Sequence, residues 1–177
     1  TGSGTFTNYA TATYSGPAGA LEATSNVVTL EYNKYTSDLI ATIDTGEETI
    51  ASGGSTTLDV YVRNEGPAPD SNYEVVITVP SETVVTPPSG CTSSGTTVTC
   101  DESAGTESST DDNTLIASEY VNISIPVVLP ANGSVYDFAV AVTSAGSDAS
   151  ADNNGESLSL PSNSSSAAIQ TFVEMPK

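Results

Sequence analysis

The sequence is poor in positive charge. Its 177 residues include 3 Lys and Arg against 22 Asp and Glu, with no histidine, and the formal net charge is −19. Proteins bind nucleic acids and anionic membranes through clustered Lys and Arg, which Lys34, Arg63 and Lys177 are too few to form. The lack of histidine excludes imidazole acid–base catalysis and imidazole metal ligands. The sequence therefore predicts no nucleic-acid partner and no histidine-dependent enzyme.

Long apolar runs and helical periodicity are also missing. No apolar run approaches the ~20 residues that cross a bilayer as a helix, so no membrane insertion is expected. No secretory signal peptide is visible, which indicates a mature or trimmed chain. Only 14% of the residues are charged while 37% are hydrophobic, and an acidic disordered tail would carry more charge. The abundant Val, Ile, Thr and Tyr instead favour β-strands.

The pattern that is present is alternation with a period of two. Between residues 57 and 63, Leu58, Val60 and Val62 are expected to face inward while Asp59 and Tyr61 face outward. Polar turns rich in Gly, Pro and Asn separate such segments, which is typical of a sandwich. The sequence therefore predicts an all-β, immunoglobulin-like antiparallel β-sandwich. Predicted strands cover residues 5–14, 26–32, 38–43, 57–63, 73–79, 83–86, 97–100, 120–128, 135–143, 158–160 and 168–173.

Two cysteines and three sequons indicate the compartment. Cys91 and Cys100 flank a Ser-Ser-Gly turn and a Thr-Val-Thr strand, so a hairpin would bring their sulfur atoms within bridging distance. Such a bridge would contribute ~2–3 kcal/mol, and two free thiols are the alternative. Asn122, Asn132 and Asn163 fit the N-glycosylation pattern. Together these features predict an extracellular or cell-surface protein.

An internal repeat divides the chain. Residues 8–15 (Asn-Tyr-Ala-Thr-Ala-Thr-Tyr-Ser) resemble residues 137–144 (Asp-Phe-Ala-Val-Ala-Val-Thr-Ser), and after each copy a small-residue loop leads to another strand. We therefore expect residues 1–36 to form an extra N-terminal β-hairpin, like the end of a preceding repeat, and residues 37–177 to form the sandwich. An isolated hairpin is marginally stable in water and must pack on its own sandwich or on a neighbour. Excision from a tandem array is the alternative.

Five ordered blocks resemble a known family. They are Ser37-Asp-Leu-Ile, the Gly-rich turn and strand ending in Asn-Glu-Gly-Pro67, Val76-Ile-Thr-Val-Pro80, the Gly-Thr-Thr-Val-Thr-Cys100 hairpin, and Asp152-Asn-Asn154. This order is similar to that of the prokaryotic surface-repeat domain catalogued as domain of unknown function eleven, over residues 37–160.

The resemblance implies an immunoglobulin-like fold found in secreted stalks, adhesins and filaments, with no catalytic residues. The acidic loop at residues 101–113 and the strand after Leu160 depart from the family's pattern.

The acidic loops are the candidate metal ligands. Asp111, Asp112 and Asn113, and separately Asp152 and Asn153, offer the hard oxygen atoms that Ca²⁺ prefers, although neither group has EF-hand spacing. Turn hydrogen bonds and solvated charge are the alternative.

No catalytic or cofactor-binding residues are predicted. Adjacent carboxylates in loops lack the separation across a cleft that glycosidases need. Tyrosines could form a sugar-binding face, although strand-surface and core positions are the simpler interpretation; they are Tyr9, Tyr14, Tyr32, Tyr61 and Tyr136.

The function expected from these observations is structural. The unclosed hairpin at residues 1–36 and the strand at residues 168–173 suggest a subunit of an extracellular filament or stalk. Such a subunit would be its own partner in a head-to-tail homopolymer, assembled by strand donation between copies. A glycan- or protein-binding adhesin module is the alternative. An enzyme is not expected.

Overall fold

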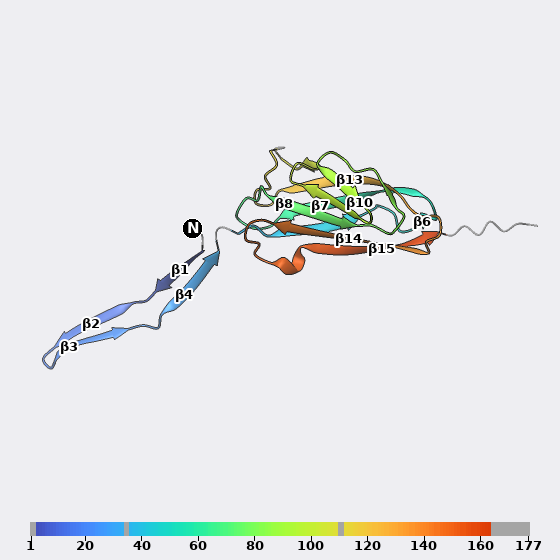
Figure 1. The fold of residues 1–177 in the computed structure, drawn as a ribbon. Helices are drawn as coiled ribbons and strands as arrows, with labels where there is room; N and C mark the ends of the chain where they lie inside the picture. The colour runs from blue at the N-terminus through green and yellow to red at the C-terminus, as the bar shows by residue number, and fades with distance from the viewer. Residues whose placement is uncertain (1–2, 34–35, 110–111, 164–177) are drawn as a thin grey trace, which may run out of the picture.

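The computed structural model describes residues 3–33, 36–109 and 112–163, with the backbone alone at residues 3–6 and 30–33. It confirms the predicted all-β sandwich and the N-terminal hairpin, which projects from it (Figure 1). The predicted strand at residues 168–173 lies outside the described residues. The one helix in the described ranges, η1 (Ala151–Asn153), is a single short turn and cannot cross a membrane.

The first layer is a six-stranded sheet with strand order β10-β11-β8-β14-β15-β6. All its pairings are antiparallel except that of β6, which runs parallel to the end of β15. The predicted short strand at residues 158–160 is in fact much longer, because its outward Ser residues also pair with β14. The strands are β6 (Ile50–Ala51), β8 (Tyr73–Thr78), β10 (Cys91–Ser94), β11 (Thr97–Asp101), β14 (Val135–Ser144) and β15 (Gly155–Asn163).

The second layer is a five-stranded antiparallel sheet. Its main order is β12-β13-β7-β5, and β9 pairs with the far end of β13. Strand β9 confirms the short edge strand expected at residues 83–86. The strands are β5 (Leu39–Asp44), β7 (Ser55–Asn64), β9 (Val84–Val85), β12 (Thr106–Glu107) and β13 (Tyr120–Val128).

The core lies between the two layers, as the alternation predicts. Leu58, Val60 and Val62 of β7 are fully buried, and the inward residues of β13 and β14 pack against the same core. The buried aromatic residues Tyr73, Tyr136 and Phe138 supply its largest side chains. Because alternate residues of each strand meet a single apolar layer, the period-two pattern in the sequence was sufficient to identify most of the core.

The part of the acidic segment at residues 101–109 contains regular structure that the sequence pattern did not predict. It contains β12, which pairs with Asn122 and Val121 of β13, and it buries Ala104 in the core. Gly105 makes this close approach possible: it has φ +88°, and a Cβ there would lie 2.4 Å from the Asn122 carbonyl oxygen. The expectation of a loop is therefore wrong at β12.

The N-terminal hairpin, which we call the arm (residues 3–33), is a long two-stranded ribbon with a break. β1 (Ser3–Asn8) pairs with β4 (Val28–Asn33), and β2 (Thr11–Gly16) pairs with β3 (Gly19–Thr24). The expected single strand at residues 5–14 is thus divided. The expected loop after it is mostly strand β3, because the Gly16-Pro-Ala-Gly19 sequence reverses the chain in a tight turn.

Candidate assembly surface

The arm has one apolar and one polar face. Residues directly opposite each other in an antiparallel pair share a face, so Tyr14 lies with Leu21 and Ala12 with Ala23. The other face carries Thr13 opposite Glu22 and further Thr and Ser residues. Tyr14 and Leu21 are 64% and 70% exposed, values typical of side chains that pack on nothing. The arm therefore presents an uncovered amphipathic surface.

Two local contacts stiffen this ribbon. The ring of Tyr14 lies over Gly16, where a Cβ would come within 2.6 Å of Tyr14 Cε1. At the break, the Ser25 N–H donates to the Ala10 carbonyl (2.8 Å), and the Ala10 N–H donates to Ser25 Oγ (2.9 Å). These two hydrogen bonds lie between the β1–β4 pair and the β2–β3 pair, so the two strand pairs form one continuous ribbon.

The attachment of the arm to the sandwich is organised by Asn64. Its Oδ1 accepts hydrogen bonds from the Asp38 N–H (3.1 Å) and the Gly66 N–H (2.9 Å). Its Nδ2 donates to the carbonyls of Ala68 (2.7 Å) and Leu115 (2.8 Å). Asn64 is completely buried and uses its full hydrogen-bonding capacity. The Asn-Glu-Gly-Pro block in the sequence therefore serves to join three loops beside the start of β5.

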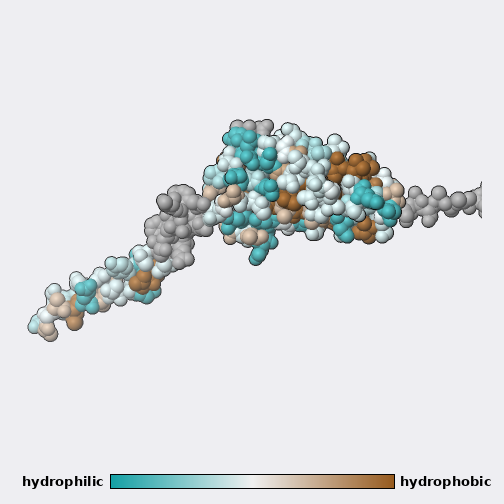
Figure 2. All heavy atoms as spheres, in the orientation of Figure 1, coloured by the Kyte–Doolittle hydropathy of each residue, from teal (hydrophilic) through white to brown (hydrophobic). Residues whose placement is uncertain are grey.

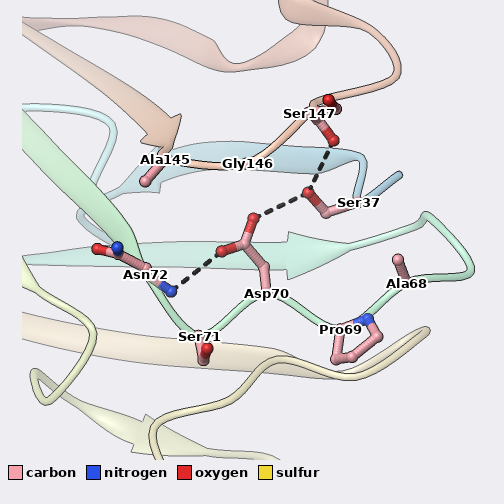
Figure 3. A pocket seen from close by; sticks show the side chains of 9 residues that line it. All are labelled: Ser37, Ala68, Pro69, Asp70, Ser71, Asn72, Ala145, Gly146 and Ser147. Atoms are coloured by element: carbon pink, nitrogen blue, oxygen red, sulfur yellow. Dashed lines mark hydrogen bonds between the residues drawn. The ribbon is translucent and has the colours of Figure 1, made fainter. Parts of the chain in front are cut away.

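A shallow hollow of about 290 Å³ lies beside this attachment and is lined by Asp70, Ser37 and their neighbours (Figure 3). The buried Asp70 carboxylate accepts hydrogen bonds from Ser37 Oγ (2.8 Å) and the Asn72 N–H (3.1 Å). Ser37 Oγ also contacts the Ser147 carbonyl oxygen (3.4 Å). Both oxygen atoms of Asp70 are thus engaged in fixing the loops around the attachment.

A second hollow opens on the outer face of the five-stranded sheet at the same end of the sandwich. We call it the tyrosine hollow; its volume is about 310 Å³, and Ile40, Tyr61 and Tyr120 form its apolar walls. The two tyrosine rings lie 6.3 Å apart at 59° and are about 40% exposed. Arg63, the only Lys or Arg in the described ranges, borders the hollow and pairs with Glu65 (3.0 Å).

The opposite end of this outer face carries a third hollow. β5 begins at the arm and β7 runs antiparallel to it, so Val128, which pairs with the first residue of β7, lies at the far end. Val84 lies directly across from Val128, and both are exposed, at 64% and 44%. Val128 lines this hollow together with Thr86 and Glu47, and Val84 lies beside it. We call it the valine hollow; its volume is about 450 Å³. Figure 2 shows apolar surface at this end of the sandwich and on the arm.

Two edge regions of the sandwich, at β5 and β15, are blocked against pairing. On β5, the Leu39 N–H donates to Asp148 Oδ2 (3.3 Å) and the Ile43 N–H donates to Glu156 Oε2 (3.0 Å). On β15, Pro161 lacks an N–H and β6 covers the following residues. These are common protections of edge strands. In contrast, strands β2 and β3 contain neither Pro nor Lys, so the arm has the less protected edges.

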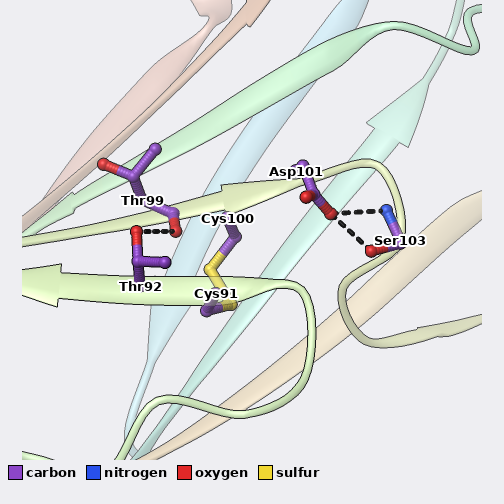
Figure 4. Close-up of a disulfide and its surroundings, with 6 residues drawn as sticks. All are labelled: Cys91, Thr92, Thr99, Cys100, Asp101 and Ser103. Carbon is purple, nitrogen blue, oxygen red and sulfur yellow. Dashed lines mark hydrogen bonds between the residues drawn. A yellow bond between two sulfur atoms is a disulfide. The ribbon is translucent and has the colours of Figure 1, made fainter.

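The cysteines form the predicted disulfide (Figure 4). Cys91 and Cys100 are direct partners in the β10–β11 hairpin, with Cα atoms 4.0 Å apart. Cys100 is completely buried in the core while Cys91 is half-buried, so the bridge fastens the edge strand β10 to the sandwich.

The candidate calcium ligands mostly make local hydrogen bonds. Asn153 Nδ2 donates to Asp38 Oδ1 (2.9 Å), and Asp112 Oδ1 accepts from the Thr114 N–H (3.1 Å). Asn113 has φ +60°, typical of a turn, while Asp152 is exposed in η1. Asp111 lies outside the described residues. Within the described ranges no three acidic or cysteine side chains gather around a common point suited to a metal ion. Calcium binding stays a prediction.

The three sequons differ in accessibility. Asn132 is exposed in the β13–β14 turn and Asn163 is exposed as the last residue of β15. Asn122 lies within β13, opposite Tyr61, and is only half-exposed; its Oδ1 is buried without a hydrogen-bond partner. Asn122 is thus the least accessible of the three sequons.

The tyrosines proposed as a sugar-binding face are not brought together. Tyr136 is buried and donates to the Pro130 carbonyl (2.6 Å), whereas Tyr9 and Tyr14 lie on the arm. The side chain of Tyr32 is outside the described set. Tyr61 instead pairs with Tyr120, which sequence reasoning missed although alternation in β13 places it outward with Asn122.

Tyr73 is a buried titratable group of the core. Its hydroxyl has no hydrogen-bond partner among the described residues. Burial, followed by the nearby charge of Glu107, raises the pKa of Tyr73 far above its ordinary value, so the neutral phenol is strongly favoured in the folded protein.

Comparison with known proteins bears on the fold. No family model matches the chain, and no curated protein matches it. Among solved structures, two of the CARDB domain of the PF1109 protein from Pyrococcus furiosus are similar, at 13% and 14% identity and TM-scores of 0.50. They cover 72% and 74% of this chain and 96% and 94% of the domain; the second is a complex with di-metal ions.

A protein from Nocardia farcinica with an immunoglobulin-like fold matches at 14% identity, with a TM-score of 0.42, over 69% of this chain and 98% of that protein. The chain is an immunoglobulin-like β-sandwich, and identities this low show the fold alone.

Proposed function

We propose that this protein is a structural subunit of an extracellular filament or surface stalk, in which the arm of one copy supplies strands to the next. The observation that carries the proposal is the exposed apolar face formed by Tyr14, Leu21 and their neighbours. A two-stranded ribbon that buries no apolar surface is marginal in water. The arm therefore gains most by packing against another molecule, and its unprotected edges favour main-chain pairing.

The proposed location and assembly follow from separate features. The Cys91–Cys100 bridge and the exposed sequons at Asn132 and Asn163 favour an oxidising, extracellular setting. The resemblance to the surface-repeat family favours the same location and supports a stalk or filament. Because the arm leaves one end of the sandwich, repeated contacts would be head-to-tail and would extend into a fibre without closing.

An adhesin module is the second candidate function. It is favoured by the tyrosine hollow, where Tyr61, Tyr120 and Arg63 present apolar and charged groups on a sheet face. Binding of the monomeric protein to a glycan array, lost in Tyr61→Ser, would support this function.

The main test compares the two faces of the arm. The double variant Tyr14→Ser and Leu21→Ser should raise the concentration needed for assembly by at least about tenfold, because two exposed anchors are lost. The matched control, Thr11→Ser and Thr24→Ser, changes the polar face and should assemble normally. Sedimentation and negative-stain microscopy measure both. The proposal would be refuted if the apolar-face variant formed fibres as the parent protein does. It would also be refuted if a chain lacking residues 1–36 kept its circular dichroism spectrum and still formed fibres normally.

A further inference from the structure

The arm and the five-stranded sheet carry apolar groups at similar spacings. On the arm, Tyr14 and Leu21 lie near the tip, whereas Val28 lies opposite Asn8. The six residues from Asn8 to Tyr14 separate the two groups by roughly 20 Å. On the outer face of the sheet, the eight residues from Tyr120 to Val128 separate the tyrosine and valine hollows by roughly 26 Å. The two spacings differ by the length of about two residues.

We propose, on the basis of the filament function above, that the apolar face of the arm lies along the outer face of the five-stranded sheet of the next copy. Tyr14 and Leu21 occupy the tyrosine hollow, and Val27 and Val28 cover the valine hollow. Val27 and Val28 are each 58% exposed. The contact thus covers most of the large apolar side chains that the described arm leaves in solvent.

The direction of this contact follows from the positions of the two ends. In a head-to-tail array with copies in the same orientation, the base of the arm meets the far end of the next sandwich first. That end carries Val84 and Val128. The tip then reaches the end that carries Tyr61 and Tyr120. A ribbon strand from Ser3 to Gly16 is roughly 46 Å long, which is enough to run along the whole sheet.

Charge favours docking through the same face of the arm. Each copy carries a formal charge of −19, so most placements of one copy on another bring carboxylates together. The apolar face of the arm carries no carboxylate at Ala12, Tyr14, Leu21 or Ala23, whereas Glu22 lies on the opposite face. Docking through the apolar face therefore turns Glu22 away from the carboxylates of the next copy. The polar middle of the sheet, where Ser124 donates to Asp59 (2.6 Å), then faces the small Ala12 and Ala23.

Two edges of the sandwich, at β5 and β15, are blocked, so the donated arm makes this contact through its apolar face and its own edges stay free for strand pairing. Asp148 and Glu156 occupy N–H groups of β5, and Pro161 interrupts the donors of β15. An incoming ribbon that paired with either strand would have to displace or avoid these groups. The outer face of β5, β7 and β13 needs no such rearrangement, and it offers a hollow at each end.

A cross-linking experiment on the full-length protein tests this placement. A Leu21→Cys variant is mixed with an equal amount of a Tyr120→Cys variant under mild oxidation that preserves the native disulfide. Disulfide-linked dimers of one Leu21→Cys chain and one Tyr120→Cys chain should form at least about tenfold faster than dimers of Leu21→Cys with Val135→Cys. Val135 is comparably exposed, at 51%, but lies on the outer face of the other sheet. Equal or faster linking to Val135→Cys would overturn the inference.

A second measurement separates this inference from the filament function. The double variant Tyr61→Ser and Tyr120→Ser should raise the assembly concentration at least about tenfold relative to Val135→Ser, with an unchanged melting temperature. Suppose that this variant assembles normally while the arm variant Tyr14→Ser and Leu21→Ser does not. The proposed docking on the five-stranded sheet would then be wrong, but the filament function would still hold. Normal assembly of both variants would overturn both.

Discussion

The carboxylate of Glu156 accepts a hydrogen bond from the backbone N–H of Ile43, at 3.0 Å, across the open side of the sandwich. The two residues belong to different sheets and are 113 positions apart in the sequence. An acidic side chain here takes the place that a neighbouring strand's carbonyl would occupy, and it closes an edge that would otherwise pair with other chains.

Removing this contact should open the β5 edge. We expect Glu156→Ala to lower the free energy of unfolding by about 1–2 kcal/mol, because the Ile43 N–H loses its partner, and to increase aggregation. Glu156→Gln keeps an acceptor oxygen and should stay close to the parent protein. Urea denaturation and light scattering measure the two effects. An alanine variant as stable as the glutamine variant would show that the bond does not protect the edge.

Asn64→Ala should be the most damaging polar substitution in the sandwich. It removes four hydrogen bonds to backbone groups, of which the Leu115 carbonyl keeps a second bond from the Asp70 N–H, and we expect a loss of at least about 3 kcal/mol in the free energy of unfolding. Asn132→Ala, in an exposed turn, serves as the control and should change stability by less than about 0.5 kcal/mol. Denaturation midpoints that fall equally for both variants would contradict the role assigned to Asn64.

The disulfide should contribute modestly to stability. Its two cysteines are nine positions apart, and closing so short a loop is worth about 2–3 kcal/mol. We expect the double variant Cys91→Ser and Cys100→Ala to fold but to unfold at lower denaturant concentration by that amount. A loss below about 0.5 kcal/mol would mean that the hairpin is held by its hydrogen bonds alone.

Stability should fall at alkaline pH because of Tyr73. The folded state raises the pKa of its phenol, so above pH ~10 the unfolded chain releases a proton that the folded chain retains. The contribution of the neutral Tyr73 phenol to the free energy of unfolding is complete below pH ~10. Above that pH the free energy of unfolding falls progressively, by up to ~1.4 kcal/mol per pH unit.

Tyr73→Phe removes both the titration and the unpartnered hydroxyl, so it should flatten this slope and leave stability at pH 7 unchanged or slightly higher. Denaturant unfolding between pH 8 and 11 makes the comparison. Equal slopes in the parent protein and the variant would contradict the assignment.

The sequence predicted the parts of the fold that depend on local pattern. Alternation correctly assigned Leu58, Val60 and Val62 to the core, and the Ser-Ser-Gly turn correctly predicted the hairpin that joins Cys91 and Cys100. Each of these inferences uses residues that are neighbours in the chain, so the physical cause is visible in a short window.

The parts that sequence reasoning missed depend on distant contacts. Strand β12 exists because Gly105 allows the backbone to approach β13, and glycine alone does not reveal what lies opposite. The bonds from Asp148 and Glu156 to β5 join residues more than a hundred positions apart. Tyr120 was missed because an outward aromatic residue on a strand becomes informative only beside Tyr61.

The buried Asn64 side chain has a mechanical consequence. Any tension applied through the arm enters the sandwich at β5, an edge strand that could be peeled away one hydrogen bond at a time. The Asn64 carboxamide binds the Asp38 N–H just before β5 and, through the Ala68 and Leu115 carbonyls, two further loops. A pulling force is therefore shared among several segments from the start, which opposes the peeling of β5 one hydrogen bond at a time.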